Sequence, residues 1–353
     1  MTEKIPTNAI PRPTLKNPMP EEERKMLEKG NAPNRDLANA VQKVGVVCNA
    51  LIDEVNKVIV GKRRMLELVT VDILAQGNIL FEDYPGLAKS LTVSTFAQAS
   101  GADFRRIQFT PDLLPSDITG IYMYNQKKSE FEFRPGPVFT NFLLADEINR
   151  APPKTQAALL ETMQERQVTV EGTTHVLQKP YIVLATQNPS EQEGTYPLPE
   201  AQLDRFMLKL ASGYPNLEEE IEILRRRAKR GKDNPDVRAV TNPEQIVQMQ
   251  KISEKIHVSD EILDYICQII IATRQDPRVY VGSSPRGSQA LFKLARAQAM
   301  LKGRDYVVPD DVKSIVMPSI AHRIILRPEP RIKGITADMV MADIIKQVPV
   351  PKV

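Results

Sequence analysis

Two adjacent carboxylates, Asp146 and Glu147, follow the apolar run Phe142–Ala145. If that run is a buried strand, both acids lie at its carboxyl end, the edge where open parallel sheets bind ligands. Asp146 could then hold a hydrated Mg²⁺, and Glu147 could orient or deprotonate an attacking water. The alternative is a solvated pair that caps the turn Ile148–Arg150.

A loop that could bind phosphate precedes this pair in the chain. It lies between the strand-like run Asn78–Phe81 and a helical run from Lys89 to Ser100. Such a loop turns backbone N–H groups and a helix N-terminus toward a polyphosphate. Lys89 would reach the terminal phosphates, and the Ser90 hydroxyl would bind Mg²⁺. We expect the loop's contacts with ATP to come from Pro85, Gly86, Leu87, Ala88, Lys89, Ser90 and Leu91.

The match of this loop to the general motif G-x-x-x-x-G-K-[ST] is incomplete. The outer glycines would fall at positions that are Asp83 and Ala88 here, and only Gly86 remains. If the loop needs a glycine backbone at position 88, alanine costs about 1–2 kcal/mol. Alone, the loop could be an ordinary strand-to-helix turn. Because Asp146 and Glu147 end a second strand further along the chain, we favour a nucleotide site.

A third apolar run, Tyr181–Thr186, ends in a polar amide, Asn188, just before Pro189. Asn188 could position the lytic water between Glu147 and the γ-phosphate. The alternative is a turn-forming asparagine before proline.

Short apolar runs that alternate with helical stretches position these residues. Strands alternating with helices predict a largely parallel sheet covered on both faces, and hence an α/β fold. The segment Val168–Gln178 has two β-prone arms about a Glu-Gly-Thr turn and predicts an inserted hairpin. The strand-like runs are Asn78–Phe81, Phe104–Phe109, Phe142–Ala145, Tyr181–Thr186 and Phe206–Leu210, and one of the intervening helices is Lys154–Arg166.

The length of the chain favours two domains. Residues 1–38 carry six prolines among charges and predict a flexible or surface-bound arm without a fold of its own. Residues 39–214 hold the strand signals and predict the nucleotide-binding core. Residues 215–353 predict a linker and an all-helical domain. Its expected helices are Leu217–Lys229, Pro243–His257, Ser259–Thr273, Pro285–Leu301 and Pro309–Ile325.

Composition argues against several other classes of protein. The formal net charge is only +3, and the basic run Arg225–Arg227 follows acidic residues one helical turn away, so nucleic-acid binding is not expected. The three histidines show no zinc-ligand spacing. The two cysteines, Cys48 and Cys267, suggest buried thiols in a reducing cytoplasm. No secretory signal or membrane span is apparent, so a soluble, cytoplasmic protein is expected.

Several ordered motifs resemble the MoxR family of AAA+ ATPases, and the similarity runs from about Val60 to Arg323. In that family a small residue such as Ala88 before the lysine is an accepted variant. The resemblance implies an AAA+ P-loop core with an all-α lid. The motifs are Pro111–Asp117, Gly136–Phe139, Leu144–Lys154, Ala185–Pro189 and Pro199–Phe206.

The resemblance also implies roles for single residues and segments. Asn188 matches sensor 1, Arg205 the arginine finger, and Arg286 the sensor 2 arginine of the lid. Read without the family, Arg205 could form a surface pair with Asp204, and Arg286 could simply follow a helix-starting proline. By the same resemblance, Val60 and Gly61 are expected near the adenine, Asp112–Val138 matches the helix-2 insert, and Val168–Gln178 matches the pre-sensor-1 hairpin.

At the level of function, the resemblance implies an ATP-hydrolysing remodeller that works as a homo-oligomeric, hexameric ring with ATP and Mg²⁺. Its client or adaptor would carry a von Willebrand factor A domain, and its task would be maturation or metal-cofactor insertion. Two alternatives stay open. One is a magnesium-chelatase-like subunit, and the other is a nucleotide-dependent assembly scaffold with little turnover.

Overall fold

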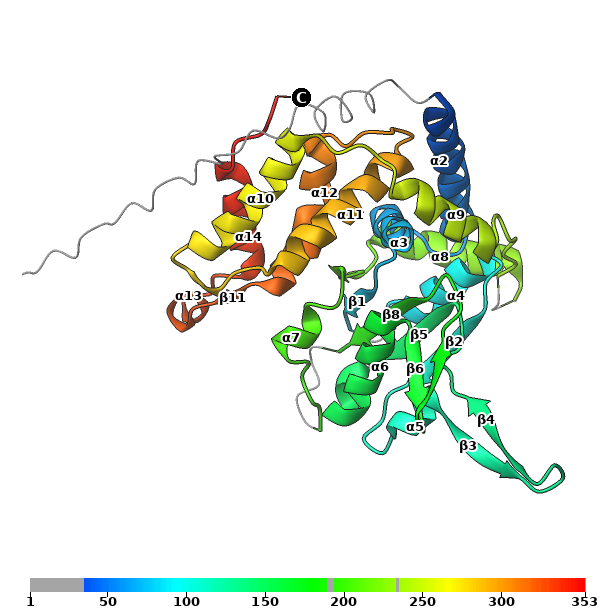
Figure 1. The fold of residues 1–353 in the computed structure, drawn as a ribbon. Helices are drawn as coiled ribbons and strands as arrows, with labels where there is room; N and C mark the ends of the chain where they lie inside the picture. Colours follow the sequence, from blue (N-terminus) through cyan, green and yellow to red (C-terminus); the bar gives the residue numbers. More distant parts are fainter. Residues whose placement is uncertain (1–34, 85, 189–193, 233–234, 353) are drawn as a thin grey trace, which may run out of the picture.

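The computed structural model describes residues 35–84, 86–188, 194–232 and 235–352. Figure 1 shows an α/β core from which a β-hairpin projects, and a helical lobe beside the core. Most of the expected N-terminal arm, and Pro85 of the expected phosphate loop, lie outside the described residues. The last four residues of the expected arm belong instead to helix α2 (Arg35–Asn56), whose apolar side packs into the core.

The core sheet has five parallel strands in the order β2-β5-β8-β1-β9. The prediction of a parallel α/β sheet is therefore confirmed. The three central strands read as continuous apolar runs because parallel strands are buried on both faces. The strands are β1 (Ile79–Glu82), β2 (Phe104–Gln108), β5 (Phe142–Asp146), β8 (Ile182–Gln187) and β9 (Leu208–Leu210).

Alternate residues of the three central strands enter two hydrophobic clusters on opposite faces of the sheet. In β5, Phe142 and Leu144 enter one cluster, whereas Leu143 and Ala145 enter the other. The first cluster contains residues of α2, α3 (Arg63–Ala75) and α4 (Lys89–Ala99), and it continues into the helical lobe. The second contains residues of α6 (Pro153–Glu165). The sheet is thus covered on both faces, and its carboxyl edge stays open for a ligand.

Two antiparallel hairpins interrupt the alternation of strands and helices. β6 (Gln167–Val170) and β7 (Thr173–Val176) form the hairpin predicted over 168–178. After α5 (Pro115–Thr119), β3 (Gly120–Asn125) and β4 (Glu130–Pro135) form a second hairpin within 112–138. The two hairpins touch where the His175 ring stacks on Phe133, with ring centroids 3.9 Å apart.

The region after residue 214 is mainly helical, but it also contains a short antiparallel sheet formed by β10 (Val279–Val281) and β11 (Ile325–Leu326). The expectation of an all-helical domain was wrong in this detail. The helices are α8 (Leu217–Arg230), α9 (Pro243–Ser253), α10 (Asp260–Gln275), α11 (Pro285–Leu301), α12 (Pro309–Ile320), α13 (Pro328–Ile332) and α14 (Ala337–Gln347).

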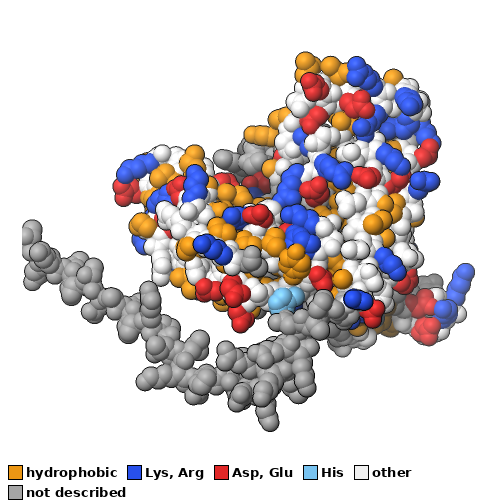
Figure 2. All heavy atoms as spheres, turned by 90° about the horizontal axis from the view of Figure 1, so that it is seen from above, with side chains coloured by type: hydrophobic (Ala, Val, Ile, Leu, Met, Phe, Trp, Pro, Cys, Tyr) orange, Lys and Arg blue, Asp and Glu red, His pale blue; other side chains and the backbone are white. Residues whose placement is uncertain are grey.

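The surface of the molecule carries both signs of charge. On the face seen in Figure 2, basic and acidic side chains are interspersed, with hydrophobic side chains between them. Cys48 is buried, and burial raises the pKa of its thiol to about 12. Cys267 is exposed on α10, so the expectation of two buried thiols was wrong for this residue. Among the described residues, no helix is both long enough and apolar enough to cross a membrane.

Candidate nucleotide site

A cavity of about 380 Å³ lies at the carboxyl edge of the sheet, where β1, β5 and β8 end and α4 begins. It brings together Lys89, Ser90, Asp146, Glu147 and Asn188, which come from distant parts of the chain. Its other lining residues are Gly86, Leu87, Ala88, Leu91, Arg106 and Thr186.

The loop before α4 has the conformation that anion binding requires. Gly86 has φ +84° and an open space around it, and Ala88 has φ +55° in the left-handed region. Ala88 therefore occupies the glycine position of the general motif in a glycine-like conformation, which costs an L-residue about 1–2 kcal/mol. No side chain caps α4 at Ala88. Its first N–H groups are thus available to a phosphate.

Lys89 supplies the positive charge of this loop. Its Nζ donates to the carbonyl oxygens of Asp83 (2.8 Å) and Tyr84 (3.2 Å). Partial burial lowers the pKa of Lys89, while the nearby carboxylates of Asp83, Asp146 and Glu147 oppose this shift. The lysine thus binds carbonyl oxygens of its own loop beside the cavity. A phosphate group would attract its ammonium group more strongly than these neutral oxygens do.

Asp146 is buried, and both of its carboxylate oxygens have partners. Oδ1 accepts from the Thr186 hydroxyl (2.6 Å), and Oδ2 accepts from Nη2 (2.6 Å) and Nε (3.1 Å) of Arg106. A serine hydroxyl and a carboxylate are suitable oxygen donors for hydrated Mg²⁺. The donor set therefore fits the ion, provided that Arg106 yields its place on Oδ2 or a water bridges the ion to the carboxylate. The side chain of Arg106 is 50% exposed, so it has room to move.

Glu147 also has a left-handed backbone, with φ +57°. Its N–H donates to the Thr186 hydroxyl oxygen (2.8 Å), which fixes the turn at the end of β5. Its Oε2 accepts from Gln108 Nε2 (2.7 Å) and lies 3.2 Å from Arg150 Nη1. The carboxylate is therefore held at the mouth of the site rather than free in solvent.

Sequence reasoning missed Arg106 and Gln108. Both lie on β2, which pairs in register with β5, so that Gln108 stands beside Asp146. The available signal was the polar end of an otherwise strand-like segment, Phe-Arg-Arg-Ile-Gln. These polar side chains could be assigned to the ligand-binding edge of the sheet only once β5 was known to be the neighbour of β2.

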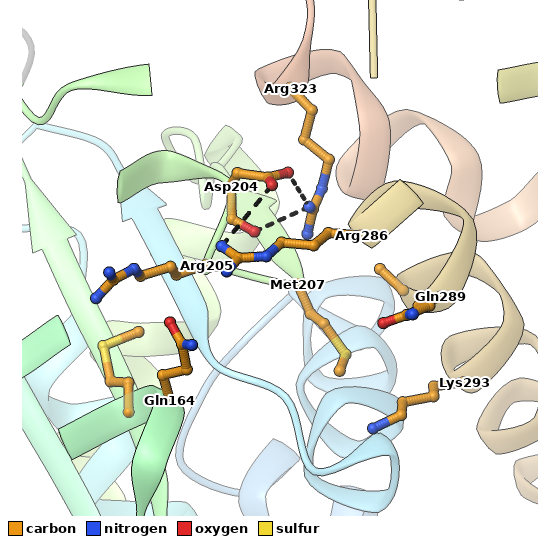
Figure 3. Close-up of a pocket in the computed structure, with 10 residues that line it drawn as sticks. Gln164, Asp204, Arg205, Met207, Arg286, Gln289, Lys293 and Arg323 are labelled. Carbon is orange, nitrogen blue, oxygen red and sulfur yellow. Dashed lines mark hydrogen bonds and ion pairs between the residues drawn. The ribbon is translucent and has the colours of Figure 1, made fainter. Parts of the chain in front are cut away.

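Arg205 and Arg286 do not line this cavity. They meet in a second one, of about 230 Å³, between the core and the helical lobe. In Figure 3, Arg286 reaches toward Asp204, which also pairs with Arg323, whereas the guanidinium of Arg205 points away from them. An Asp204 oxygen accepts from the Ser284 hydroxyl (3.0 Å), and Arg323 donates to the other oxygen of the same carboxylate. The helical lobe thus holds the turn that carries Arg205 through hydrogen bonds to Asp204.

Val60 and Gly61 lie outside the lining of the cavity. Gly61 has φ +73°, and a Cβ there would fall 1.9 Å from Glu219 Oε1, so another residue would be strained and would displace the Glu219 side chain. The next residue, Lys62, donates from Nζ to the Tyr214 carbonyl oxygen (3.1 Å). Tyr214 in turn stacks on Tyr84 of the loop, with ring centroids 6.0 Å apart.

The five-stranded parallel sheet, the lysine-bearing loop before α4 and the helical lobe beside the core are the features of a P-loop core with a lid. Comparison with known families agrees. Residues 78–208 match the model of the ATPase family associated with various cellular activities (AAA), and residues 271–344 match the AAA lid domain.

Individual relatives give a narrower placement. The chain is 42% identical over 311 residues to Chaperone MoxR1 of Mycobacterium tuberculosis, covering 86% of this chain and 82% of that protein. It is 49% identical over 302 residues to the uncharacterized protein YeaC of Bacillus subtilis, covering 85% of this chain and 93% of that one. A crystal structure from Cytophaga hutchinsonii, described as a candidate ATPase, superposes with a TM-score of 0.82 at 41% identity, covering 94% of this chain and 99% of that one. The chain belongs to the MoxR family of AAA+ ATPases.

Proposed function

We propose that this protein binds ATP with Mg²⁺ in the Lys89 cavity and hydrolyses it. The observation that carries the proposal is the convergence of a cation, a hydroxyl, two carboxylates and an amide on one cavity at the open edge of the sheet. Each of these groups has a separate task in phosphoryl transfer: together they can bind the phosphates, hold the metal and activate the attacking water.

The proposed division of labour follows the position of each group. Lys89 and the N–H groups at the start of α4 bind the terminal phosphates. Ser90 and Asp146 hold Mg²⁺, which neutralises the negative charge of the β- and γ-phosphates when bound. Glu147 orients and deprotonates the attacking water, and Asn188 positions that water. Before turnover, Arg106 binds the carboxylate of Asp146 and Gln108 binds that of Glu147. For turnover, the metal must replace Arg106 and the attacking water must replace Gln108.

The proposed active unit is a ring, and we expect a hexamer. Arg205 and Arg286 are absent from the lining of the Lys89 cavity and meet each other in a different one. This separation supports a role of Arg205 on the nucleotide held by a neighbouring subunit. A guanidinium supplied in this way contributes about 10³–10⁵ in rate in well-studied cases.

We further propose that the ring remodels partner proteins in the cytoplasm. The name Chaperone MoxR1 of a relative supports a protein client. A client or adaptor with a von Willebrand factor A domain, and a task in maturation or metal-cofactor insertion, remain our proposals from the family resemblance. The β3–β4 hairpin supports contact with a protein, because it exposes Met123, Tyr124 and Phe131.

Steady-state phosphate release tests the proposal. Glu147→Gln should bind ATP-Mg with an affinity like that of the wild type and release almost no phosphate, because the amide keeps the shape and loses the base. Lys89→Ala should fail to bind ATP, because the phosphates lose the loop's lysine. Wild-type turnover by Glu147→Gln would move the role of the base to another residue. A pull-down with Glu147→Gln, held in its ATP state, should enrich the client.

A nucleotide-dependent scaffold is the second candidate function. The engagement of Asp146 by Arg106 favours it, because this ion pair occupies a proposed metal ligand. In that case the wild type would bind ATP and assemble but release little phosphate. Arg106→Ala would then not raise turnover.

A further inference from the structure

Asp83 stands where the general phosphate-loop motif has its first glycine, immediately after β1. The residue is only 6% exposed, so its carboxylate needs partners within the protein. Those partners are backbone N–H groups of Ser212 and Gly213, in the turn that follows β9. The nitrogen of Gly213 lies 3.3 Å from Oδ1, and Ser212 donates to Oδ2.

This arrangement is a small anion-binding nest that an amino-acid side chain fills. Gly213 has φ +66°, a left-handed conformation that turns successive N–H groups toward one point. Hydrogen bonds to an ionised acceptor are roughly twice as strong as neutral ones. The carboxylate therefore fastens the beginning of the phosphate loop to the turn at 211–214. Glycine at position 83 could make neither bond.

The fastened turn connects several parts of the nucleotide site. Tyr214 of the turn stacks on Tyr84 of the loop, and its carbonyl accepts from Lys62, next to Gly61. The backbone carbonyl of Asp83 itself accepts from Lys89 Nζ at 2.8 Å. The loop's lysine, the turn and the segment expected near the adenine thus meet around this one residue.

We propose that Asp83 is a positioning residue of the nucleotide site. Its carboxylate holds the loop on the turn at 211–214 and so places Lys89 and the N–H groups of α4 where phosphates bind. The inference rests on the proposed ATP site. Asp83 itself touches no substrate atom in this account.

Titration of ATP-Mg into the full chain tests the role, with binding heat as the readout at a temperature where every variant is folded. Asp83→Gly should weaken ATP binding about ten-fold or more, because two bonds to a charged acceptor are lost. Asp83→Asn should fall between this variant and the wild type, since its amide oxygen still accepts one bond. Glu82→Gln is the matched control, because Glu82 is the neighbouring acid and pairs with Lys209 at 2.5 Å instead. Its affinity should be unchanged.

Asp83→Gly distinguishes two accounts of the loop, because they predict opposite changes in ATP affinity. Asp83→Gly brings the loop closer to the general motif, so an account based on motif matching predicts equal or tighter binding. ATP binding by Asp83→Gly at wild-type affinity would overturn the proposal.

Hydrogen exchange in the nucleotide-free protein gives a second readout, independent of turnover. Peptides that span Ser212 and Gly213 should exchange faster in Asp83→Gly and Asp83→Asn than in the wild type or Glu82→Gln. Weakened binding without faster exchange would also overturn the proposal, because the carboxylate would then not fasten the turn. If Asp83→Gly does not fold, Asp83→Asn carries both readouts. Undiminished ATP binding by Lys89→Ala would instead refute the proposed site, and the exchange result would still show whether Asp83 holds the turn.

Discussion

Ala88 and Glu147 are ordinary L-residues held in the left-handed region at the mouth of the candidate site. Such conformations cost free energy and persist only where the surrounding structure fixes them. Ala88 is fixed between β1 and α4, and Glu147 by the hydrogen bond from its N–H to Thr186. Both outliers lie where the proposed chemistry needs a backbone turned toward the ligand.

Ala88→Gly should raise the free energy of unfolding by about 0.5–1 kcal/mol. Glycine relieves the left-handed strain of about 1–2 kcal/mol, and its greater freedom in the unfolded chain returns part of that gain. Chemical denaturation measures the difference. The control is Ala50→Gly at an exposed position within α2, which should lose about 1 kcal/mol. A loss of stability in Ala88→Gly comparable to that of the control would show that the left-handed backbone carries no strain.

The residues with obvious chemistry were predictable because each follows an apolar run. Asp146 ends the buried strand β5, Glu147 and Asn188 directly follow β5 and β8, and Lys89 follows a strand and a loop. Parallel strands end at one edge, so these residues had to converge. Arg106 and Gln108 could not be found in this way, because their place beside Asp146 depends on the order of strands in the sheet.

At the scale of elements, several hydrogen bonds between the core and the lid meet at the turn that carries Arg205. Asp204 accepts from Ser284 and Arg323, and the Phe206 carbonyl accepts from Arg323 and from the His322 ring. His322 is half-buried, and desolvation lowers its pKa to about 3. A neutral ring in the folded state and a chargeable ring in the unfolded state make this seam sensitive to acid.

The sign of this effect follows from proton linkage. Below about pH 6.5, the usual pKa of histidine, the unfolded chain binds a proton at His322 that the folded chain does not bind. Stability should therefore fall by as much as about 1.4 kcal/mol per pH unit from this residue, until the pH nears its folded pKa. His322→Gln keeps an N–H for the Phe206 carbonyl and cannot titrate. Denaturation between pH 7 and 4.5 should show a flatter profile for the variant, and parallel profiles would remove His322 as the cause.

Short elements in the lid were beyond prediction from sequence. β10 and β11 are three and two residues long, and their pairing has a bulge between Val279 and Val281. So few residues give no usable period. The helix α11 was predicted with its observed bounds, because proline at the start and a sustained apolar face mark it. The predicted ends at His257 and Ile325 were wrong, since α9 ends at Ser253 and α12 at Ile320.

At the scale of the whole molecule, the separation of two sets of residues shapes the proposed mechanism. One subunit holds Lys89, Asp146 and Glu147 in one cavity and presents Arg205 and Arg286 in another. The lid contacts the Arg205 turn of the same chain, so movement of the lid would move the guanidinium that we propose to act on a neighbouring subunit. An isolated subunit is thus expected to bind ATP and to hydrolyse it slowly.

Mixing two inactive variants tests this account most directly. Lys89→Ala should fail to bind ATP, and Arg205→Ala should bind ATP while its turnover collapses. In a mixed ring, some interfaces pair an intact Lys89 on one subunit with an intact Arg205 on the other. Steady-state phosphate release should therefore return in part when the two proteins exchange subunits. No recovery despite verified subunit exchange, or normal turnover by Arg205→Ala alone, would contradict the account.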